Sequence, residues 1–295
     1  MPKPSLRTAL AVSLAIAACP AWAEELPVTY VVAGRKVAAT LSLPERVRNP
    51  PVVLLLPEFA GNRDERRGGA VKEGVYARAA QRWAQQGIAS LRIDYRYNGD
   101  SDGQFADGSL DAFVIDGVQA LEYLAGTGKV DPQRMAVVGW GMGGAVATAV
   151  AARSRHPLDG LALWNPDIDV GAAFIQRFGR DKVRQGLAGA SAPTTIDLAV
   201  GRTIALKQPF FVSLFTLSPP AEIARYGGPL MVAVGTQDEI GAPQPALAES
   251  LIRYHGGEGE LLVLPMDRLL NLGKSRRQVD ALIEATESFL LNHFR

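Results

Sequence analysis

Residues 134–152, RMAVVGWGMGGAVATAVAA, decide the fold of this chain. Met135 to Val138 form a short apolar run, which predicts a buried strand. Gly143 and Gly144 precede a run of mostly small residues, Ala145 to Ala152, which predicts a helix that packs closely against this strand. The stretch therefore predicts a strand, a tight glycine turn and a small-residue helix in direct succession.

The turn itself, GWGMG at 139–143, matches the pattern G-x-S-x-G except at its centre. In that pattern, a strand–turn–helix context presents a nucleophilic serine at the tip of the turn. Gly141 occupies the serine position, so we expect the geometry of the turn without its nucleophile. Glycine suits this position because a strained backbone costs about 1–3 kcal/mol for a residue with a Cβ and far less for glycine.

The rest of the chain alternates between strands and helices. Strands are predicted at 52–56, 88–93, 160–164, 229–234 and 260–264, helices at 74–86, 110–124, 245–254 and 278–294, and an opening hairpin at 28–43. This alternation is typical of an α/β fold with a mostly parallel sheet and helices on both faces. The 295 residues, of which 47% are hydrophobic, are sufficient for one large domain of this kind.

One segment, residues 165–226, interrupts the alternation between two predicted core strands. It contains a helical part at 170–187, a hairpin formed by 196–199 and 202–206, and an apolar, aromatic part at 209–217. A long insertion at the edge of the sheet where ligands bind is usually a lid. We therefore expect a cap over the site; the alternative is an embellishment that merely covers the edge of the sheet.

The N-terminus has the parts of a secretory signal peptide. These parts are the basic residues Lys3 and Arg7, the apolar residues 10–18, and the small-x-small sequence Ala21-Trp22-Ala23. We expect a signal peptide at 1–23, cleavage after Ala23, a single domain at 24–295 and a periplasmic or secreted location. A lipoprotein anchored at Cys19 is the alternative, which Pro20 disfavours.

Composition excludes several functional classes. The net charge of +1 gives no reason to expect a nucleic acid or an anionic membrane as partner, and no segment after the N-terminus is long and apolar enough to span a bilayer. Cys19 is the single cysteine, which excludes a disulfide framework and a cysteine nucleophile in the body of the chain. Since no metal-ligand cluster and no phosphate-binding glycine loop is present, we expect no cofactor and no metal.

Four stretches resemble the α/β-hydrolases of the serine aminopeptidase type, and most closely the cinnamoyl and feruloyl esterases. They are PEFAGN (57–62), DYRYNGDSDGQF (94–105), GWGMGG (139–144) and GGPLMVAVGTQDEIGAP (227–243). The resemblance extends from Val52 to the C-terminus and implies an α/β-hydrolase fold with a small inserted cap. It also implies an oxyanion loop at 57–62 and a triad acid at Asp238.

The resemblance fails at two positions that acyl transfer requires, the nucleophile and the base. The nucleophile position is Gly141, and the position of the family's histidine is Arg268, within the sequence PMDR at 265–268. A guanidinium group cannot accept a proton near neutral pH. The family's His-Gly pair is replaced by Pro57-Glu58, so only Asp238 of the triad remains.

Neither the three histidines of the chain nor a second glycine–serine motif offers a clear substitute for the missing base and nucleophile. His156 and His255 precede strands and so belong to the opposite edge of the sheet, and His293 lies in the last helical turn. The sequence GDSDG at 99–103 matches G-x-S-x-G as a string, but it lies in a polar loop. We interpret Ser101 as a turn residue.

Three functions remain open at this point. The first is a non-catalytic hydrolase-fold protein that binds a small ligand or a partner. The second is an active serine-type hydrolase of ester or amide bonds that uses unmapped residues. The third is a purely structural or interaction domain. The sequence carries no signal for the oligomeric state.

A remnant binding site follows from the first hypothesis. The backbone amides of Phe59 and Met142 are the expected oxyanion donors, because these groups do not depend on side chains. Arg268 would add a positive fork suited to a small carboxylate or acyl ligand, and the missing side chain of Gly141 would leave room for it. Candidate walls of this pocket are Phe210, Phe211 and Phe215.

The alternative is that Arg268 is not available to a ligand. It could instead pair with Asp238 or Asp267, both of which are close to it in the predicted site. Such a pair would close the pocket.

Overall fold

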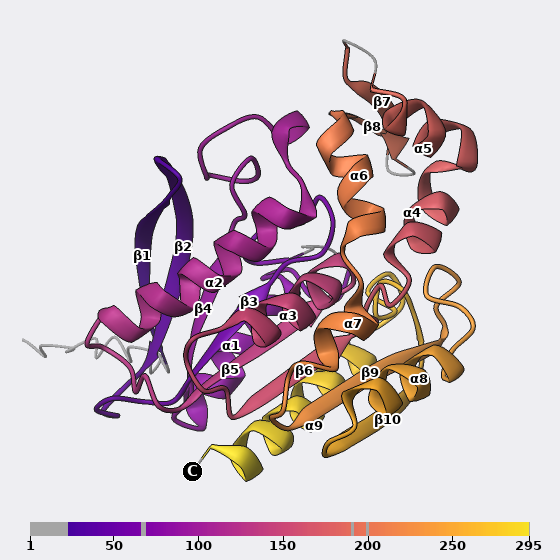
Figure 1. The fold of residues 1–295 in the computed structure, drawn as a ribbon. Coiled ribbons are helices and arrows are strands. Elements are labelled where there is room, and N and C mark those ends of the chain that lie inside the picture. Colours follow the sequence, from indigo (N-terminus) through magenta and orange to yellow (C-terminus); the bar gives the residue numbers. More distant parts are fainter. Residues whose placement is uncertain (1–22, 66–68, 190–191, 199–200, 295) are drawn as a thin grey trace, which may run out of the picture.

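The computed structural model describes residues 23–65, 69–189, 192–198 and 201–294. An eight-stranded sheet forms its centre, with the strand order β1-β2-β4-β3-β5-β6-β9-β10 (Figure 1). The strands are β1 (Ala23–Val32), β2 (Arg35–Pro44), β3 (Val52–Leu56), β4 (Ala89–Ile93), β5 (Met135–Trp140), β6 (Gly160–Trp164), β9 (Leu230–Gln237) and β10 (Gly259–Asp267). The expected signal peptide and Cys19 lie outside the described residues, apart from Ala23, which begins β1.

The predicted mostly parallel sheet is confirmed. From β4 to β10 all neighbouring strands are parallel, whereas β1 and β2 form the predicted hairpin and join the sheet antiparallel. Every residue of β3, β4, β5 and β6 is buried, as expected for strands that are covered on both faces.

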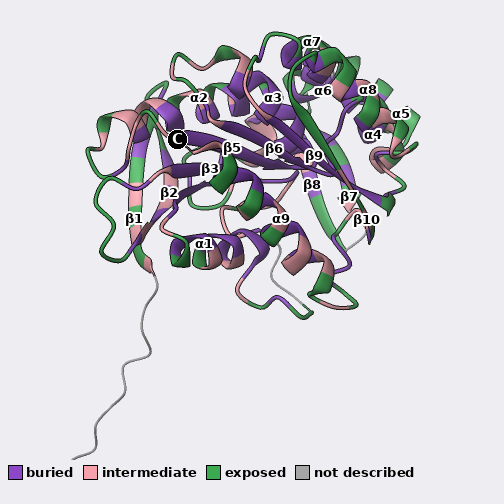
Figure 2. Cartoon of the chain, turned by 90° about the horizontal axis from the view of Figure 1, so that it is seen from below, coloured by how far each residue is buried: buried purple, intermediate pink, exposed green. Residues whose placement is uncertain are grey.

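Helices cover both faces of the sheet, as predicted. They are α1 (Val75–Gln85), α2 (Leu110–Gly126), α3 (Met142–Arg153), α8 (Ala246–His255) and α9 (Arg277–His293), with a short 3₁₀ turn η1 (Phe105–Asp107). Helices α2, α3 and α8 share one core cluster, and α1 and α9 share the cluster on the other face (Figure 2). Among the described residues, no helix is long and apolar enough to cross a membrane.

The glycine turn after β5 sets the position of α3. The helix begins at Met142, three residues before the predicted start, because Gly141 has φ 59° and ends the strand abruptly. A Cβ at Gly143 would overlap the backbone oxygens of Leu56 and Pro57. The glycines therefore allow the small-residue helix to lie directly against β3 and β5.

The inserted segment 165–226 forms a group of short elements of its own. These are α4 (Val170–Phe178), α5 (Arg180–Leu187), β7 (Thr194–Leu198), β8 (Arg202–Leu206), α6 (Gln208–Thr216) and α7 (Pro219–Ile223). The predicted helical part at 170–187 is broken at Gly179, which has φ 85°. Strands β7 and β8 pair antiparallel as the predicted hairpin, and they lie together with α4, α5 and α6 in Figure 1.

Candidate functional site

The residues of the candidate site follow the carboxyl ends of five parallel strands. Glu58 follows β3, Gly141 follows β5, Asp167 follows β6, Asp238 follows β9 and Arg268 follows β10. Parallel strands bring their carboxyl ends to one edge of the sheet, where ligands of open α/β sheets bind. The structure therefore brings Gly141, Asp238 and Arg268 together, as the resemblance implies.

The space beside Gly141 is filled. A Cβ at this position would lie 2.5 Å from Cγ of Glu58 and 2.7 Å from Nη2 of Arg268. The predicted room beside Gly141 is therefore wrong. Glu58 and Arg268 occupy the place where a serine hydroxyl would stand. The family that the sequence resembles has glycine and histidine at these two positions.

Arg268 lies at the centre of a buried ion-pair cluster. Its Nη2 donates to Oδ1 of Asp167 at 2.6 Å and to Oε1 of Glu58 at 3.2 Å, and its Nη1 donates to Oδ2 of Asp238 at 3.2 Å. Nη1 also donates to the backbone oxygen of Asn165 at 2.9 Å. Of the two alternatives for Arg268, the structure thus supports pairing with Asp238 and not an unpaired cation.

Asp267, the other aspartate considered as a partner, serves a different purpose. Its Oδ1 accepts hydrogen bonds from the backbone N–H groups of Leu269 and Asn271, at 3.0 and 2.9 Å. Its Oδ2 lies 3.6 Å from Nζ of Lys274. Asp267 therefore holds the turn after β10, and this turn directs Arg268 into the cluster.

Electrostatics keep Arg268 charged. Burial opposes the charge, but the negative fields of Asp167, Glu58 and Asp238 outweigh burial and raise the pKa of Arg268. The side chain is only 11% exposed. A general base must accept a proton, and a guanidinium in this surrounding cannot do so.

The structure adds Arg177, a residue of the inserted segment that the sequence did not single out. Its Nη2 lies 2.6 Å from Oε1 of Glu58 and 3.3 Å from Oδ2 of Asp167. Its guanidinium carbon also lies 4.9 Å from the ring centre of Phe174. Arg177 thus ties α4 to the cluster, which contains three carboxylates and two guanidinium groups. The sequence did not single out Asp167 either. It does contain a signal for this residue, because the polar stretch NPDID at 165–169 directly follows a predicted core strand.

The expected oxyanion donors are backbone N–H groups on two different segments. Met142 is the first residue of α3, and Phe59 follows Glu58 in the loop after β3. Among the hydrogen bonds within the described part of the chain, none is donated by the backbone N–H of Phe59 or Met142. Two backbone donors at a helix N-terminus and a neighbouring loop suit a developing oxyanion or a bound carbonyl oxygen.

Aromatic rings pack around Phe59, where the inserted segment meets the sheet. The ring centre of Phe59 lies 5.0 Å from that of Phe174 and 5.5 Å from those of Phe178 and Phe210. Phe59, Phe174 and Phe210 are buried, so these rings fill the region next to the elbow. We call Phe59, Phe105, Phe174, Phe178 and Phe210 the phenylalanine cluster.

Only part of the predicted aromatic wall is found. Phe210 belongs to the phenylalanine cluster, and the buried Phe211 packs against it with ring centres 5.8 Å apart. Phe215 is 53% exposed, so its expected role as a wall is wrong. It lies on α6 two turns from the start of the helix, where its ring contacts Gly171.

Ser101 has a structural role. Its hydroxyl donates to the backbone oxygen of Asp94 at 2.7 Å and accepts from the backbone N–H of Ala38 at 2.8 Å. The hydroxyl therefore connects the loop to β2. The serine is held by two backbone groups, in agreement with its interpretation as a turn residue.

The three histidines lie away from the elbow. Nε2 of His156 lies 3.1 Å from Oε2 of Glu122, and Nδ1 of His293 lies 2.7 Å from the backbone oxygen of Phe289. His255 ends α8 and packs against Tyr226, and burial lowers its pKa. None of these contacts places an imidazole next to the expected nucleophile position.

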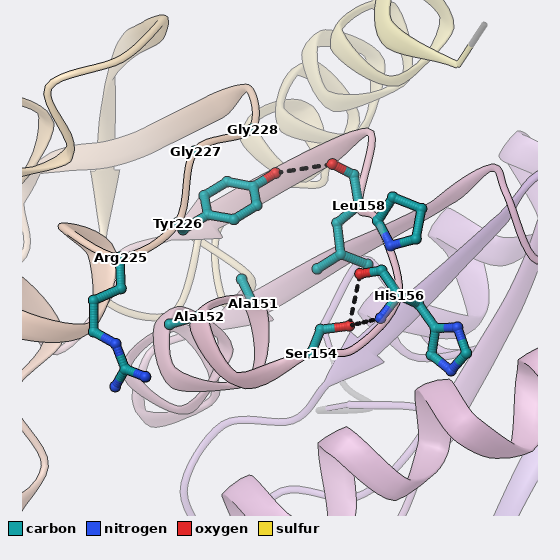
Figure 3. A pocket seen from close by; sticks show the side chains of 10 residues that line it. Ala151, Ala152, Ser154, His156, Leu158, Arg225, Tyr226, Gly227 and Gly228 are labelled. Carbon is teal, nitrogen blue, oxygen red and sulfur yellow. Dashed lines mark hydrogen bonds between the residues drawn. The ribbon is translucent and has the colours of Figure 1, made fainter.

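Two cavities lie elsewhere on the molecule. The first, about 330 Å³, is at the amino end of β6 and β9 and is lined by residues that include Ser154, His156 and Arg225 (Figure 3). Figure 3 shows the side chains of His156 and Arg225 pointing away from each other, so they do not converge on a ligand. The second cavity lies beside Glu24, Arg46 and Lys129. Within the described residues no group of acidic, histidine or cysteine side chains could hold a metal ion.

Comparison with known proteins finds a family that is similar to part of this chain. Residues 67–200 match the family "Serine aminopeptidase, S33". No curated protein sequence matches the chain.

Solved structures give a more extensive match. A structure of ferulic acid bound to Est1E from Butyrivibrio proteoclasticus is 20% identical, with a TM-score of 0.70 over 90% of this chain and 98% of that chain. The α/β-hydrolase GrgF from Penicillium sp. sh18 is 16% identical, with a TM-score of 0.73 over 92% and 99%. The Pyrococcus furiosus esterase Pf2001 is 15% identical, with a TM-score of 0.64 over 92% of each chain.

These similarities agree with the fold described above. The solved structures share the fold at low identity, and the family match covers the region that contains the elbow. The chain therefore has the α/β-hydrolase fold, and its residues 67–200 are similar to the serine aminopeptidase family.

Proposed function

We propose that this chain is an exported, non-catalytic α/β-hydrolase that acts by binding. The observation that carries the proposal is the filled nucleophile position. A side chain at 141 would collide with Glu58 and Arg268, and both of these are held by further ion pairs. Nucleophilic catalysis requires a side chain at this place, and the cluster excludes one.

The charge of the cluster supports the same conclusion. Asp238, which would orient a catalytic histidine, instead pairs with Arg268 at 3.2 Å. An ion pair between these two residues leaves neither a base nor the group that would position one. Nucleophile, base and acid are thus all changed or diverted.

An activity assay tests this proposal. The purified protein should not hydrolyse p-nitrophenyl acetate, p-nitrophenyl butyrate or methyl ferulate above the level of a heat-unfolded sample. It should also remain unlabelled by a fluorophosphonate probe, which reacts with activated serines. Labelling of a serine, or turnover that follows the protein through purification, contradicts the proposal and favours an active hydrolase with unmapped residues.

The ligand proposed for the site is a small acyl compound. The backbone N–H groups of Phe59 and Met142 are suited to a carbonyl oxygen. Because Arg268 already faces three carboxylates, a neutral acyl group fits better than a free carboxylate. The inserted segment would act as a cap that opens for this ligand, since α4 and α6 bring Phe174 and Phe210 onto Phe59.

Calorimetric titration distinguishes the two ligand chemistries. We expect methyl ferulate to bind and ferulic acid to bind more weakly, because ferulate would meet the excess of carboxylates. If ferulic acid binds more tightly, and Arg268→Ala abolishes that binding, the carboxylate alternative is correct. If neither compound binds, the ligand chemistry proposed for this site is wrong.

Export is proposed from the sequence of the first 23 residues. Expression of the full chain in a Gram-negative host should yield a periplasmic protein whose N-terminal residue is Glu24, measured by fractionation and mass spectrometry. A membrane-bound product that becomes soluble in Cys19→Ser identifies the lipoprotein alternative. A cytoplasmic product that retains Met1 contradicts export.

A further inference from the structure

The two expected oxyanion donors differ in what holds them in place. The N–H of Met142 belongs to the first residue of α3, so the helix fixes its direction. The N–H of Phe59 lies in the loop after β3, outside any helix or strand. The direction of this second donor must therefore come from the hydrogen bonds of the loop itself.

Phe59 occupies the corner of a tight turn. The N–H of Gly61 donates to the backbone oxygen of Glu58 at 3.0 Å, which closes a β-turn over residues 58–61. Ala60, the third residue of this turn, has φ 56°. A positive φ at the third position alone is characteristic of a type II turn. The N–H of the second residue takes no part in closing such a turn, so the N–H of Phe59 is left for a ligand.

Ala60 makes this turn strained. A type II turn usually has glycine at its third position, because a residue with a Cβ is disfavoured at positive φ. Strained residues of this kind persist only where the surrounding structure imposes their conformation, and they are common at ligand clamps and active sites. Alanine at position 60 therefore indicates that contacts from outside the turn hold its shape.

Two side chains hold the ends of the turn. At its start, the N–H of Glu58 donates to Oε1 of Glu65, whose side chain is fully buried. At its end, Nδ2 of Asn98 donates to the backbone oxygen of Gly61. A Cβ at Gly61 would overlap the carboxylate of Glu65, so this carboxylate lies directly against the turn.

The backbone of Glu65 is itself held by the core. Its oxygen accepts a hydrogen bond at 3.1 Å from the N–H of Val75, the first residue of α1. Its N–H donates to the backbone oxygen of Asn62 at 2.9 Å. Helix α1 packs against the sheet, so Glu65 connects the turn to a fixed element of the fold.

From this arrangement we infer that Glu65 and Asn98 are positioning residues, which direct the N–H of Phe59 toward the carbonyl oxygen of the ligand. The inference rests on the proposed binding of a small acyl compound. Glu65 acts through the N–H of Glu58, and Asn98 acts through the backbone oxygen of Gly61. Oxyanion donors are effective because they are held in place before the ligand arrives, so loss of either side chain should weaken binding.

Calorimetric titration with methyl ferulate tests the role of both side chains. Glu65→Ala and Asn98→Asp should each weaken binding by about tenfold, because one end of the turn is released. Asn98→Asp removes the donor but retains Oδ1, which accepts the N–H of Gly99. Glu65→Gln retains an acceptor oxygen and should weaken binding by less than about threefold.

Thr286→Val is the matched control for a loss of stability without a loss of position. It removes the buried hydrogen bond from Nε1 of Trp164 to Oγ1 of Thr286, which is 3.0 Å long and lies in another part of the fold. This variant should lower the melting temperature and leave the affinity for methyl ferulate unchanged. Circular dichroism should show that all variants are folded.

Ala60→Gly distinguishes positioning from a general loss of structure. Glycine adopts φ 56° without strain, so the turn depends less on its two clamps. Ala60→Gly should therefore recover most of the affinity that Glu65→Ala loses, and a double variant without any recovery overturns the inference. Should Glu65→Ala fail to fold, Asn98→Asp with and without Ala60→Gly provides the same test.

A measurement without ligand tests the clamp independently of the proposed ligand. In protein labelled with ¹⁵N-phenylalanine, the amide signal of Phe59 is identified by its loss in Phe59→Leu. This signal should shift in Glu65→Ala and Asn98→Asp and stay in place in Thr286→Val. If the signal shifts but the wild type does not bind methyl ferulate, the proposed ligand is wrong and the clamp stands. A signal that neither variant moves, or an affinity that neither variant changes, overturns the inference.

Discussion

Two segments of this chain share the glycine spacing of a nucleophile motif, and each lacks what the other has. The elbow at 139–143 has the strand, the positive φ and the helix that a nucleophile requires, but Gly141 has no side chain. The loop at 99–103 has a serine, but its hydroxyl is engaged by two backbone groups. The comparison teaches that the tertiary surroundings of the motif, and not its letters, determine its chemistry.

The two segments also differ in how charge stabilises them. At the elbow, Arg268 is buried among three carboxylates. At the loop, Arg63 pairs with the buried Asp94 and with the exposed Asp100 at 2.6 Å, and its own side chain is partly exposed. Removing a cation should therefore cost more at the elbow.

Arg268→Ala is the change from which we expect the largest effect. It should lower the free energy of unfolding by about 3–5 kcal/mol, because buried carboxylates lose their partner. Arg63→Ala at the loop should cost only about 1 kcal/mol, because Arg63 is partly exposed and solvent screens its ion pairs. Urea denaturation measures both. Equal losses would mean that the two ion-pair groups are equivalent, which contradicts the comparison.

Gly141→Ala should have the next largest effect. The added Cβ meets Glu58 and Arg268, and the backbone has φ 59°, so we expect a loss of about 2–4 kcal/mol. Gly141→Ser should cost about the same, since the Cβ causes the collision.

A double-mutant cycle shows whether contact with Glu58 causes the loss of stability in Gly141→Ala. The variant with both Gly141→Ala and Glu58→Ala should be more stable than the sum of the two single losses predicts, because the residues are in contact. Additive losses would indicate that backbone strain alone, and not the filled space, determines the cost.

Ser101→Ala should have a smaller effect on stability. Loss of a hydroxyl that joins two backbone groups should cost about 1–2 kcal/mol. Ser288→Ala, whose hydroxyl bonds within an exposed helical turn, is the control and should change little. If the fluorophosphonate probe labels the wild type and Ser101→Ala prevents this, the loop contains the nucleophile and our interpretation of it is wrong.

Restoration of activity is the smallest effect that we expect. Gly141→Ser alone should give no measurable ester hydrolysis, because no base is available. Gly141→Ser with Arg268→His should give slight activity, because Asp238 can then orient the imidazole and triad members act as a unit. Adding Glu58→Gly should increase the rate of p-nitrophenyl acetate hydrolysis further, because it removes the side chain that fills the serine position. An equally active single variant would show that Arg268 does not occupy the base position.

Much of the fold was predictable from local patterns. Apolar runs such as Val52 to Leu56 must be buried on both faces, and the opening hairpin turns at Ala33-Gly34. The helical part at 170–187 was predicted without its break, because Gly179 alone is a weak signal for two helices. Phe215 was assigned to a wall because composition cannot tell which side of a short apolar helix faces the core.

The sequence by itself determined that this chain has the α/β-hydrolase fold and lacks the side chains of the nucleophile and the base. Fold patterns are local and periodic, and the residue types at the nucleophile and base positions can be read directly from the sequence. Only the tertiary structure decided what replaces them. Glu58, Arg268 and the pair Asp167 and Arg177 come from three separate segments, and their charges meet only when the strands align. Ion pairing depends on distances of a few ångströms between remote residues, and no local pattern in a sequence specifies such distances.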